Sequence, residues 1–198
     1  MKKRVFIIHG WGGTPKKEWF LWLKKELEKK RIEVFAPAMP NPEEPKIEEW
    51  VPFIANLVGV PDENTYFVGH SIGYQAIMRY LETLPKNTKF GGAVFVAGWF
   101  DLTEFTYKEE PEEEEESREI AKPWIEKTID LKKIKKMTKN FVAIFSDNDP
   151  YVELKNKNVF EKEIGAKIIM ESNRGHFSRS DGITKLPIVL EKILEMSK

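Results

Sequence analysis

The sequence predicts one α/β domain built on a mostly parallel sheet of about six strands, and three observations support this fold class. The chain has 198 residues, enough for a single domain with a substantial core. Short apolar runs alternate with amphipathic helical patterns along the whole chain. Several runs are apolar at consecutive positions, which is typical of strands covered on both faces. We therefore expect a doubly wound sheet with helices on both faces, spanning residues 1–198 without a linker or repeat.

Each expected element has its own pattern. The strands are the short apolar runs Val5–Ile8, Val34–Ala36, Tyr66–Val68, Ala93–Ala97, Phe141–Phe145 and Lys167–Met170. The helices carry apolar residues three or four positions apart. Their stripes run over Trp19–Leu27, Ile47–Leu57, Ala76–Leu81, Leu154–Ile164 and Ile183–Met196. Pro187 is compatible with the last helix only near its first turn.

An acidic insertion around residues 104–120 interrupts this alternation. Its core is the run Glu109–Glu116, broken only by Pro111. Because dense like charge repels itself, we expect an exposed or mobile loop that leads into one or two helices around Trp124 and Ile134. A solvated insertion is the favoured interpretation, and a lid over a functional site is the alternative.

The composition excludes several classes of function. Lys+Arg and Asp+Glu both number 32, so the basic excess typical of nucleic-acid-binding proteins is missing. The absence of cysteine excludes disulfides, thiolate metal sites and a cysteine nucleophile, and we expect no metal or other cofactor. No apolar run approaches the roughly 18 residues that would span a bilayer, and the N-terminal segment does not resemble a secretory signal. We therefore expect a cytoplasmic protein without membrane insertion.

The pattern Gly69-His70-Ser71-Ile72-Gly73 is the main indication of function. It follows the third expected strand and precedes a helical pattern. This context is typical of a nucleophile elbow, in which a serine sits on a strained turn between strand and helix. The structural alternative is a serine in a glycine-bounded turn or a helix N-cap. The strand-to-helix context favours the nucleophile, and with it an α/β-hydrolase.

A serine nucleophile requires a base and an acid, which follow it in this fold in the order acid, then histidine. His176 follows the last expected strand and is the only histidine in the required place, since His9 and His70 precede or adjoin Ser71. The acid should follow the strand Phe141–Phe145. Asp149 is favoured because a residue just beyond the strand can point sideways toward the histidine loop, and Asp147 remains the alternative.

An oxyanion hole needs backbone N–H groups directed at the developing charge. We expect one from Ile72 and one from Trp11, in the loop His9–Gly13 after the first strand. The glycines of this loop do not form a phosphate loop, because the Lys-Ser/Thr ending is absent.

Ligands of open parallel sheets bind beyond the carboxyl ends of the strands. The loops expected there carry Met39, Trp99 and Phe100, which predict an apolar pocket for an acyl or aromatic group.

These motifs resemble the small serine hydrolases related to retinoblastoma-binding protein nine. The similarity extends over nearly the whole chain and includes the opening Val5–Trp11, the elbow and the Gly175-His176-Phe177 segment. The most diagnostic part is Met-Pro-Asn-Pro at residues 39–42 followed by Trp50. The resemblance implies a compact α/β-hydrolase without a large cap domain, with Asp149, directly before a proline, as the acid. The chain departs from many relatives at Tyr74, where they carry a small residue.

The predicted function is a carboxylesterase that cleaves small or medium acyl esters by a Ser71–His176–Asp149 triad. Two alternatives remain open. A binding protein could retain the hydrolase fold without catalysis, and an acyltransferase or peptidase could use the same residues. A small ester is the expected partner, and no feature indicates a nucleic acid or a particular protein partner.

Overall fold

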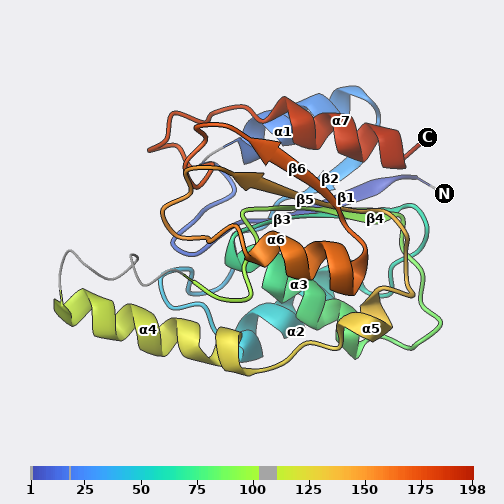
Figure 1. Ribbon diagram of the computed structural model, residues 1–198. Coiled ribbons are helices and arrows are strands. Elements are labelled where there is room, and N and C mark those ends of the chain that lie inside the picture. The colour runs from blue at the N-terminus through green and yellow to red at the C-terminus, as the bar shows by residue number, and fades with distance from the viewer. Residues whose placement is uncertain (1, 18, 103–110) are drawn as a thin grey trace.

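A six-stranded parallel sheet forms the centre of the computed structural model, which describes residues 2–17, 19–102 and 111–198 and, at 111–114, the backbone only. The strand order is β2-β1-β3-β4-β5-β6, and every neighbouring pair is parallel (Figure 1). The strands are β1 (Arg4–Ile8), β2 (Glu33–Phe35), β3 (Thr65–His70), β4 (Gly92–Val96), β5 (Phe141–Ser146) and β6 (Lys167–Glu171). Each expected strand is confirmed to within two residues at either end.

Side-chain alternation along the strands divides the core into two layers. Val5 and Ile7 of β1 belong to one buried cluster, and Phe6 and Ile8 belong to the other. Helices α1 (Phe20–Lys29) and α7 (Pro187–Met196) cover the first face. The opposite face carries α2 (Ile47–Val58), α3 (Ile72–Thr83), α5 (Leu131–Ile134) and α6 (Asn156–Val159). The doubly wound architecture predicted from the sequence is therefore confirmed.

The two C-terminal stretches predicted as helices differ from their expected form. The last helix begins at Pro187 rather than Ile183, because proline lacks an N–H and fits the first helical position, where no partner is needed. The stripe Leu154–Ile164 is not one regular helix: α6 is followed by a π-helical segment, Phe160–Ile164, that ends at Gly165 in the left-handed region, with φ of 70°.

The acidic insertion is partly helical, and the expectation of a loop up to Glu116 was wrong. Helix α4 spans Pro111–Glu126, and its glutamates at 115 and 116 are exposed. Negative charge in the first turns of a helix is favourable because it faces the positive end of the helix dipole, and proline is well suited to the first position. Residues 103–110, with Glu109 and Glu110, lie outside the described residues. The helices expected around Trp124 and Ile134 are confirmed as α4 and α5.

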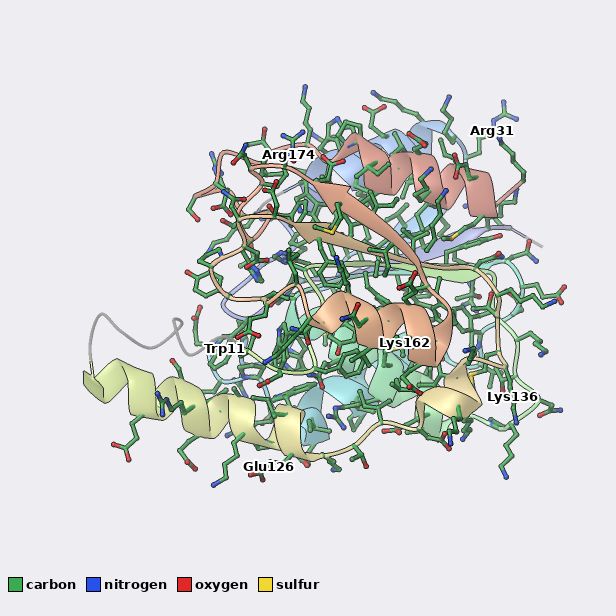
Figure 2. The ribbon with its side chains drawn as sticks, in the orientation of Figure 1. Trp11, Arg31, Glu126, Lys136, Lys162 and Arg174 are labelled. Carbon is green, nitrogen blue, oxygen red and sulfur yellow. The ribbon has the colours of Figure 1, made fainter. Side chains whose placement is uncertain are left out.

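Helix α4 lies beyond α2, and its N-terminal part projects past the end of the sheet (Figure 1, and with side chains in Figure 2). Its C-terminal part is anchored by Trp124, which is 2% exposed and packs edge-on against Trp50 at 6.1 Å between ring centroids. Within the described residues, no helix combines the length and apolarity needed to cross a membrane.

Candidate active site

Ser71 occupies the sharp turn between β3 and α3. Its φ of 50° and ψ of −131° are strained values for a residue with a side chain. The two flanking glycines explain how the turn is possible. A Cβ on Gly69 would lie 2.6 Å from the Cα of Tyr74, and one on Gly73 would lie 2.5 Å from the carbonyl oxygen of His9. Glycine is therefore required at both positions, because α3 lies too close to β3 and to the end of β1 to leave room for a side chain.

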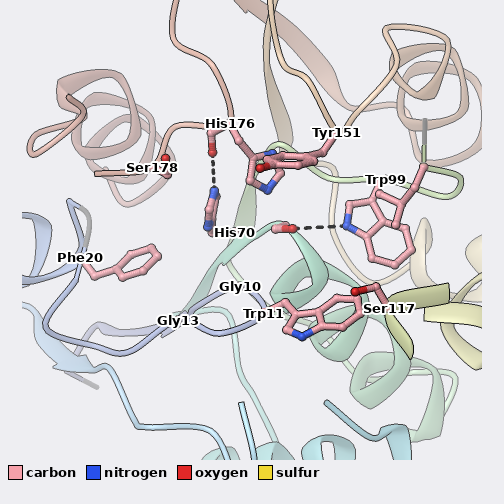
Figure 3. Close-up of a pocket in the computed structure, with 12 residues that line it drawn as sticks. Gly10, Trp11, Gly13, Phe20, His70, Trp99, Ser117, Tyr151, His176 and Ser178 are labelled. Carbon is pink, nitrogen blue, oxygen red and sulfur yellow. Dashed lines mark hydrogen bonds between the residues drawn. The ribbon is translucent and has the colours of Figure 1, made fainter. Parts of the chain in front are cut away.

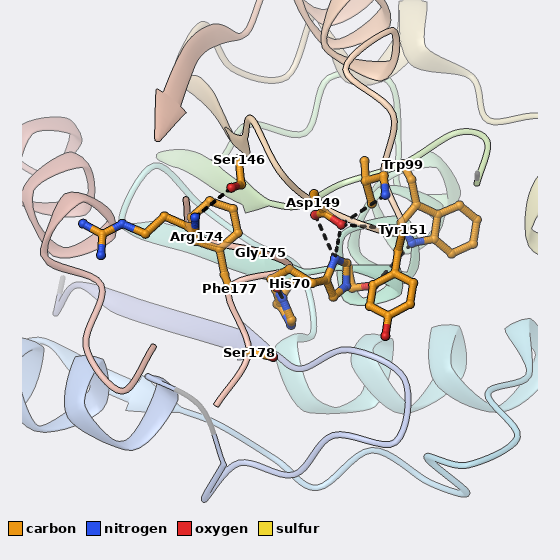
Figure 4. Close-up of polar contacts among 12 residues, drawn as sticks. His70, Trp99, Ser146, Asp149, Tyr151, Arg174, Gly175, Phe177 and Ser178 are labelled. Carbon is orange, nitrogen blue, oxygen red and sulfur yellow. Dashed lines mark hydrogen bonds and ion pairs between the residues drawn. The ribbon is translucent and has the colours of Figure 1, made fainter. Parts of the chain in front are cut away.

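Asp149 and His176 meet beyond the carboxyl ends of β5 and β6. The His176 Nδ1–H donates to the Asp149 carboxylate, at 2.9 Å from Oδ2 and 3.1 Å from Oδ1 (Figure 4). The Asp149 side chain is only 2% exposed and also accepts the N–H groups of Tyr151 and Val152 at 2.9 and 3.1 Å. With Nδ1 carrying the proton, the Nε2 of a neutral His176 has a lone pair that can accept one.

Asp147, the alternative acid, lies on the surface of the same loop. Its Oδ1 accepts the N–H of Asn173 at 2.8 Å, and this hydrogen bond is the main cause that lowers the pKa of Asp147. The structure thus brings Asp149 to His176 and gives Asp147 a structural role in joining two loops.

Two amides are expected to form an oxyanion hole: that of Trp11 in the loop after β1, and that of Ile72 at the start of α3. Within the described residues, neither the Trp11 N–H nor the Ile72 N–H has a hydrogen-bond partner. Buried His9 holds this loop: its Nδ1–H donates to the Gly10 carbonyl at 2.7 Å, and its Nε2 accepts the Met39 N–H at 3.0 Å. This pair of bonds requires neutral imidazole, and burial lowers the pKa of His9.

A cavity of about 390 Å³ opens beside Ser71 (Figure 3). Its described lining is largely aromatic and carries no Lys, Arg, Asp or Glu side chain. The lining residues are Gly10, Trp11, Gly13, Phe20, His70, Ser71, Trp99, Leu102, Ser117, Tyr151, His176 and Ser178.

Of the three residues expected in the pocket, Trp99 lines this cavity. Met39 and Phe100 lie elsewhere. Met39 is 3% exposed and packs in the core, where its amide is bound to His9. Phe100 packs on Tyr74 and Phe160, with centroid distances of 5.6 and 5.1 Å.

Comparisons with known proteins identify the family of this chain. A family model for serine hydrolases matches residues 5–195. The chain is 31% identical over 191 residues to the YdeN protein of Bacillus subtilis (strain 168), covering 96% of this chain and 94% of YdeN. The chain belongs to the serine hydrolase family. The serine hydrolase RBBP9 of Rattus norvegicus is 27% identical over 181 residues, covering 90% and 89% of the two chains, so the resemblance found in the sequence is confirmed.

Solved structures confirm the α/β-hydrolase fold of this serine hydrolase. The crystal structure of the B. subtilis ydeN gene product superimposes with a TM-score of 0.85 at 30% identity, covering 98% of each chain. A meta-cleavage product hydrolase from Pseudomonas fluorescens has a TM-score of 0.63 at 16% identity, covering 98% of this chain and 91% of its own, and shows the shared fold alone.

The Met-Pro-Asn-Pro…Trp element of this serine hydrolase braces the loop after β1. The Trp50 Nε1–H donates to the Pro40 carbonyl at 2.7 Å. Two bonds then join this segment to the loop: Gly12 N–H donates to the Pro42 carbonyl at 2.7 Å, and Trp11 Nε1–H donates to the Glu43 carbonyl at 2.8 Å. The motif therefore fixes the backbone on which the Trp11 amide is carried.

His70, which adjoins Ser71 in the sequence, supports the loop that carries His176 in this serine hydrolase. Its Nε2 lies 2.8 Å from the His176 carbonyl, and because a carbonyl can only accept, Nε2 must carry the proton. Burial, reinforced by the neighbouring His176, lowers the pKa of His70 to about 3. Neutral His70 packs against Trp19 and Phe20, with ring centroids 6.1 and 5.8 Å away.

Further polar side chains hold the same loop and were also missed. Ser146 Oγ accepts the Arg174 N–H at 3.0 Å (Figure 4). Asn148 Oδ1 accepts the Gly175 N–H at 2.9 Å. Asp181 Oδ2 accepts the His176 N–H at 3.0 Å. A turn-forming Asp five residues after the histidine was the one visible signal for this support.

The described part of this serine hydrolase holds no group of three or more His, Asp or Glu side chains that could bind a metal ion.

Proposed function

We propose that this serine hydrolase is a carboxylesterase in which Ser71, His176 and Asp149 act as a catalytic triad. The observation that carries the proposal is the 2.9 Å contact between His176 Nδ1 and the buried Asp149 carboxylate, beside a cavity that Ser71 lines. A buried carboxylate on Nδ1 fixes the tautomer in which Nε2 is the base. The strained turn at Ser71 adds support, because such strain is typical of a nucleophile elbow.

The proposed reaction proceeds through an acyl-enzyme. His176 Nε2 takes the Ser71 proton while Oγ forms a bond to the ester carbonyl carbon, and the carbonyl electron pair moves to its oxygen. The N–H groups of Trp11 and Ile72 would bind that oxyanion. When the carbonyl re-forms, the bond to the alcohol oxygen breaks and His176 protonates the leaving alcohol. Water then attacks the acyl-enzyme by the same steps and releases the acid and free Ser71.

The lining of the cavity supports an uncharged acyl group as the substrate's acid part. Apolar surface is offered by Trp11, Phe20, Trp99, Leu102 and Tyr151. A carboxylate or ammonium group buried here would lack a charged partner among the described residues. We therefore expect p-nitrophenyl esters of short and medium fatty acids to be hydrolysed, with a preference that a series from acetate to decanoate would define.

Ser71→Ala tests the assignment of the nucleophile. It should abolish both p-nitrophenyl ester hydrolysis and labelling by a fluorophosphonate, with Ser197→Ala as the control that retains both. Labelling of Ser71→Ala would contradict the assignment. A folded wild-type protein that neither hydrolyses esters nor reacts with the probe would instead favour a non-catalytic binding protein, and turnover confined to peptides or added acyl acceptors would favour a peptidase or acyltransferase.

A further inference from the structure

Trp99 contributes a hydrogen-bond donor directly to the serine that we propose as the nucleophile. Its indole Nε1–H donates to Ser71 Oγ at 3.3 Å, as Figure 3 shows. Trp99 is 1% exposed. The short segment that joins it to β4 contains Ala97, whose φ of 49° is a strained value for a non-glycine residue. Because this segment is strained, other parts of the structure must hold the Trp99 indole in place against Ser71.

Helix α3 supplies the first support. The Trp99 carbonyl accepts the Tyr74 hydroxyl and also the Gln75 Nε2–H at 3.1 Å. Gln75 is itself fixed, because its Oε1 accepts an Nη2–H of Arg79 at 3.0 Å. Arg79 also donates to the Trp124 carbonyl of α4 at 2.9 Å. A continuous set of buried hydrogen bonds thus runs from α4 through α3 to Trp99 and Ser71.

Helix α6 supplies the second support. Asn156 is 2% exposed, and its Oδ1 accepts the N–H groups of Phe100 and Asp101 at 2.7 and 3.2 Å. Its Nδ2 donates to the carbonyls of Asp101 and Glu153, both at 3.0 Å. The Asn156 side chain therefore binds the backbone just after Trp99, while α3 binds the Trp99 carbonyl, so the segment that carries the indole is held from two directions.

The indole does not compete with His176 for the serine proton. A hydroxyl group offers one donor and two acceptor positions, so Oγ can accept from Trp99 and still donate to His176 Nε2. An indole is a donor only, so with Trp99 on one acceptor position the serine hydrogen must point elsewhere. This geometry keeps the serine proton available for transfer.

We propose that Trp99 is a further catalytic residue, whose indole N–H binds Ser71 Oγ and stabilises the negative charge on it in both halves of the reaction. This inference rests on the proposed function. In acylation, charge develops on Oγ as its proton passes to His176. In deacylation, the bond between Oγ and the acyl carbon breaks, the electron pair goes to Oγ, and His176 returns the proton. Trp99 keeps its own proton throughout.

Trp99→Phe tests the proposal. Loss of one hydrogen bond to the reacting oxygen should slow fluorophosphonate labelling and lower kcat for p-nitrophenyl acetate about tenfold. The KM for acetate should change little, because an acetyl group does not fill the cavity. If the wild type is labelled and Trp99→Phe reacts equally fast or faster, the inference is wrong. If the wild type itself is not labelled, the proposed function has failed instead.

A pair of tyrosine variants tests the position of the indole donor without changing the volume of the indole. Tyr74→Phe removes a support of Trp99, whereas Tyr80→Phe removes a comparable bond from the same helix, between its hydroxyl and the Gly59 carbonyl at 2.7 Å. We expect slower labelling in the first variant only, and equal labelling rates would overturn the role of the support.

A spectroscopic readout is independent of turnover. The ¹⁵N–¹H signal of the Trp99 indole, assigned by its loss in Trp99→Phe, should shift in Ser71→Ala because its acceptor is gone. An unchanged signal would show that the bond does not exist in solution.

Discussion

At the scale of single residues, two aspartates in one loop have different environments. The side chain of Asp149 is buried and binds the ring of His176, whereas Asp147 is exposed and binds the backbone of Asn173. Only the first can hold an imidazole in one tautomer. Their closeness in sequence makes them a matched pair for experiment.

We expect Asp149→Asn to lower kcat for p-nitrophenyl esters by about 10³- to 10⁴-fold, because the amide would stabilise the wrong tautomer of His176. Asp147→Asn should retain activity within a fewfold range. Steady-state kinetics of both variants, with circular dichroism to verify folding, check this. Equal losses in the two variants would contradict the assignment of the acid.

His70 makes stability depend on pH. Unfolded, it binds a proton near pH 6.5, but in the folded protein burial lowers its pKa to about 3, so between these values the unfolded state binds more protons. Stability should therefore fall as the pH drops below 6.5, by up to about 1.4 kcal/mol per pH unit for such a group. The lowered pKa of His9 adds to the same trend.

Urea unfolding of wild type and His70→Gln between pH 7 and pH 4 checks this expectation. The variant should be less stable than the wild type at pH 7, because it loses the packing and the hydrogen bond of His70. Its free energy of unfolding should nevertheless decrease less steeply as the pH falls. An acid dependence as steep as that of the wild type would show that His70 is not the group responsible.

At the scale of elements, the loops that carry the site depend on neighbours distant in sequence. The segment 39–45 is bound by Trp50 of α2 and Trp124 of α4, and it in turn binds the loop that carries Trp11. Indole donors recur in this region because a large apolar ring can be buried while its one N–H satisfies a loop carbonyl.

Trp50→Phe should therefore have two effects. It should lower the free energy of unfolding by about 1–3 kcal/mol, since a fully buried ring becomes smaller and the Pro40 carbonyl loses its donor. It should also lower kcat, because the amide of Trp11 is held less firmly. Trp22→Phe, on α1 at the opposite face of the sheet, serves as the control and should leave kcat unchanged. An unaltered kcat in Trp50→Phe would remove the link between this brace and catalysis.

At the scale of the whole molecule, both buried clusters rest on one sheet. Adjacent residues of each strand point into different clusters, so neither layer can lose its packing while the other keeps an intact sheet. We expect one cooperative unfolding transition in urea, with far-UV circular dichroism and tryptophan fluorescence coinciding. Separate midpoints for the two signals would contradict a shared core.

The sequence was sufficient for the features that follow from periodicity. Continuous apolar strands predicted the parallel sheet, and the glycines around Ser71 predicted its turn. The helix of the acidic insertion does not follow from its charge pattern, because the favourable position of glutamates near a helix N-terminus opposes their mutual repulsion. The roles of His70, Asn156 and Gln75 could not be foreseen, because each depends on a backbone carbonyl or amide that tertiary folding brings near, and such groups have no sequence signature.

The strand order has a consequence for the synthesis of the protein. Ser71 follows the third strand and His176 the sixth, although both line one cavity at the carboxyl ends of the strands. A chain growing from the ribosome thus exposes its nucleophile long before the base and the acid exist. On the proposed assignment, the nascent polypeptide has no esterase activity, and this activity begins only when the last strand joins the sheet. Enzymatic activity would then report completed translation and folding together.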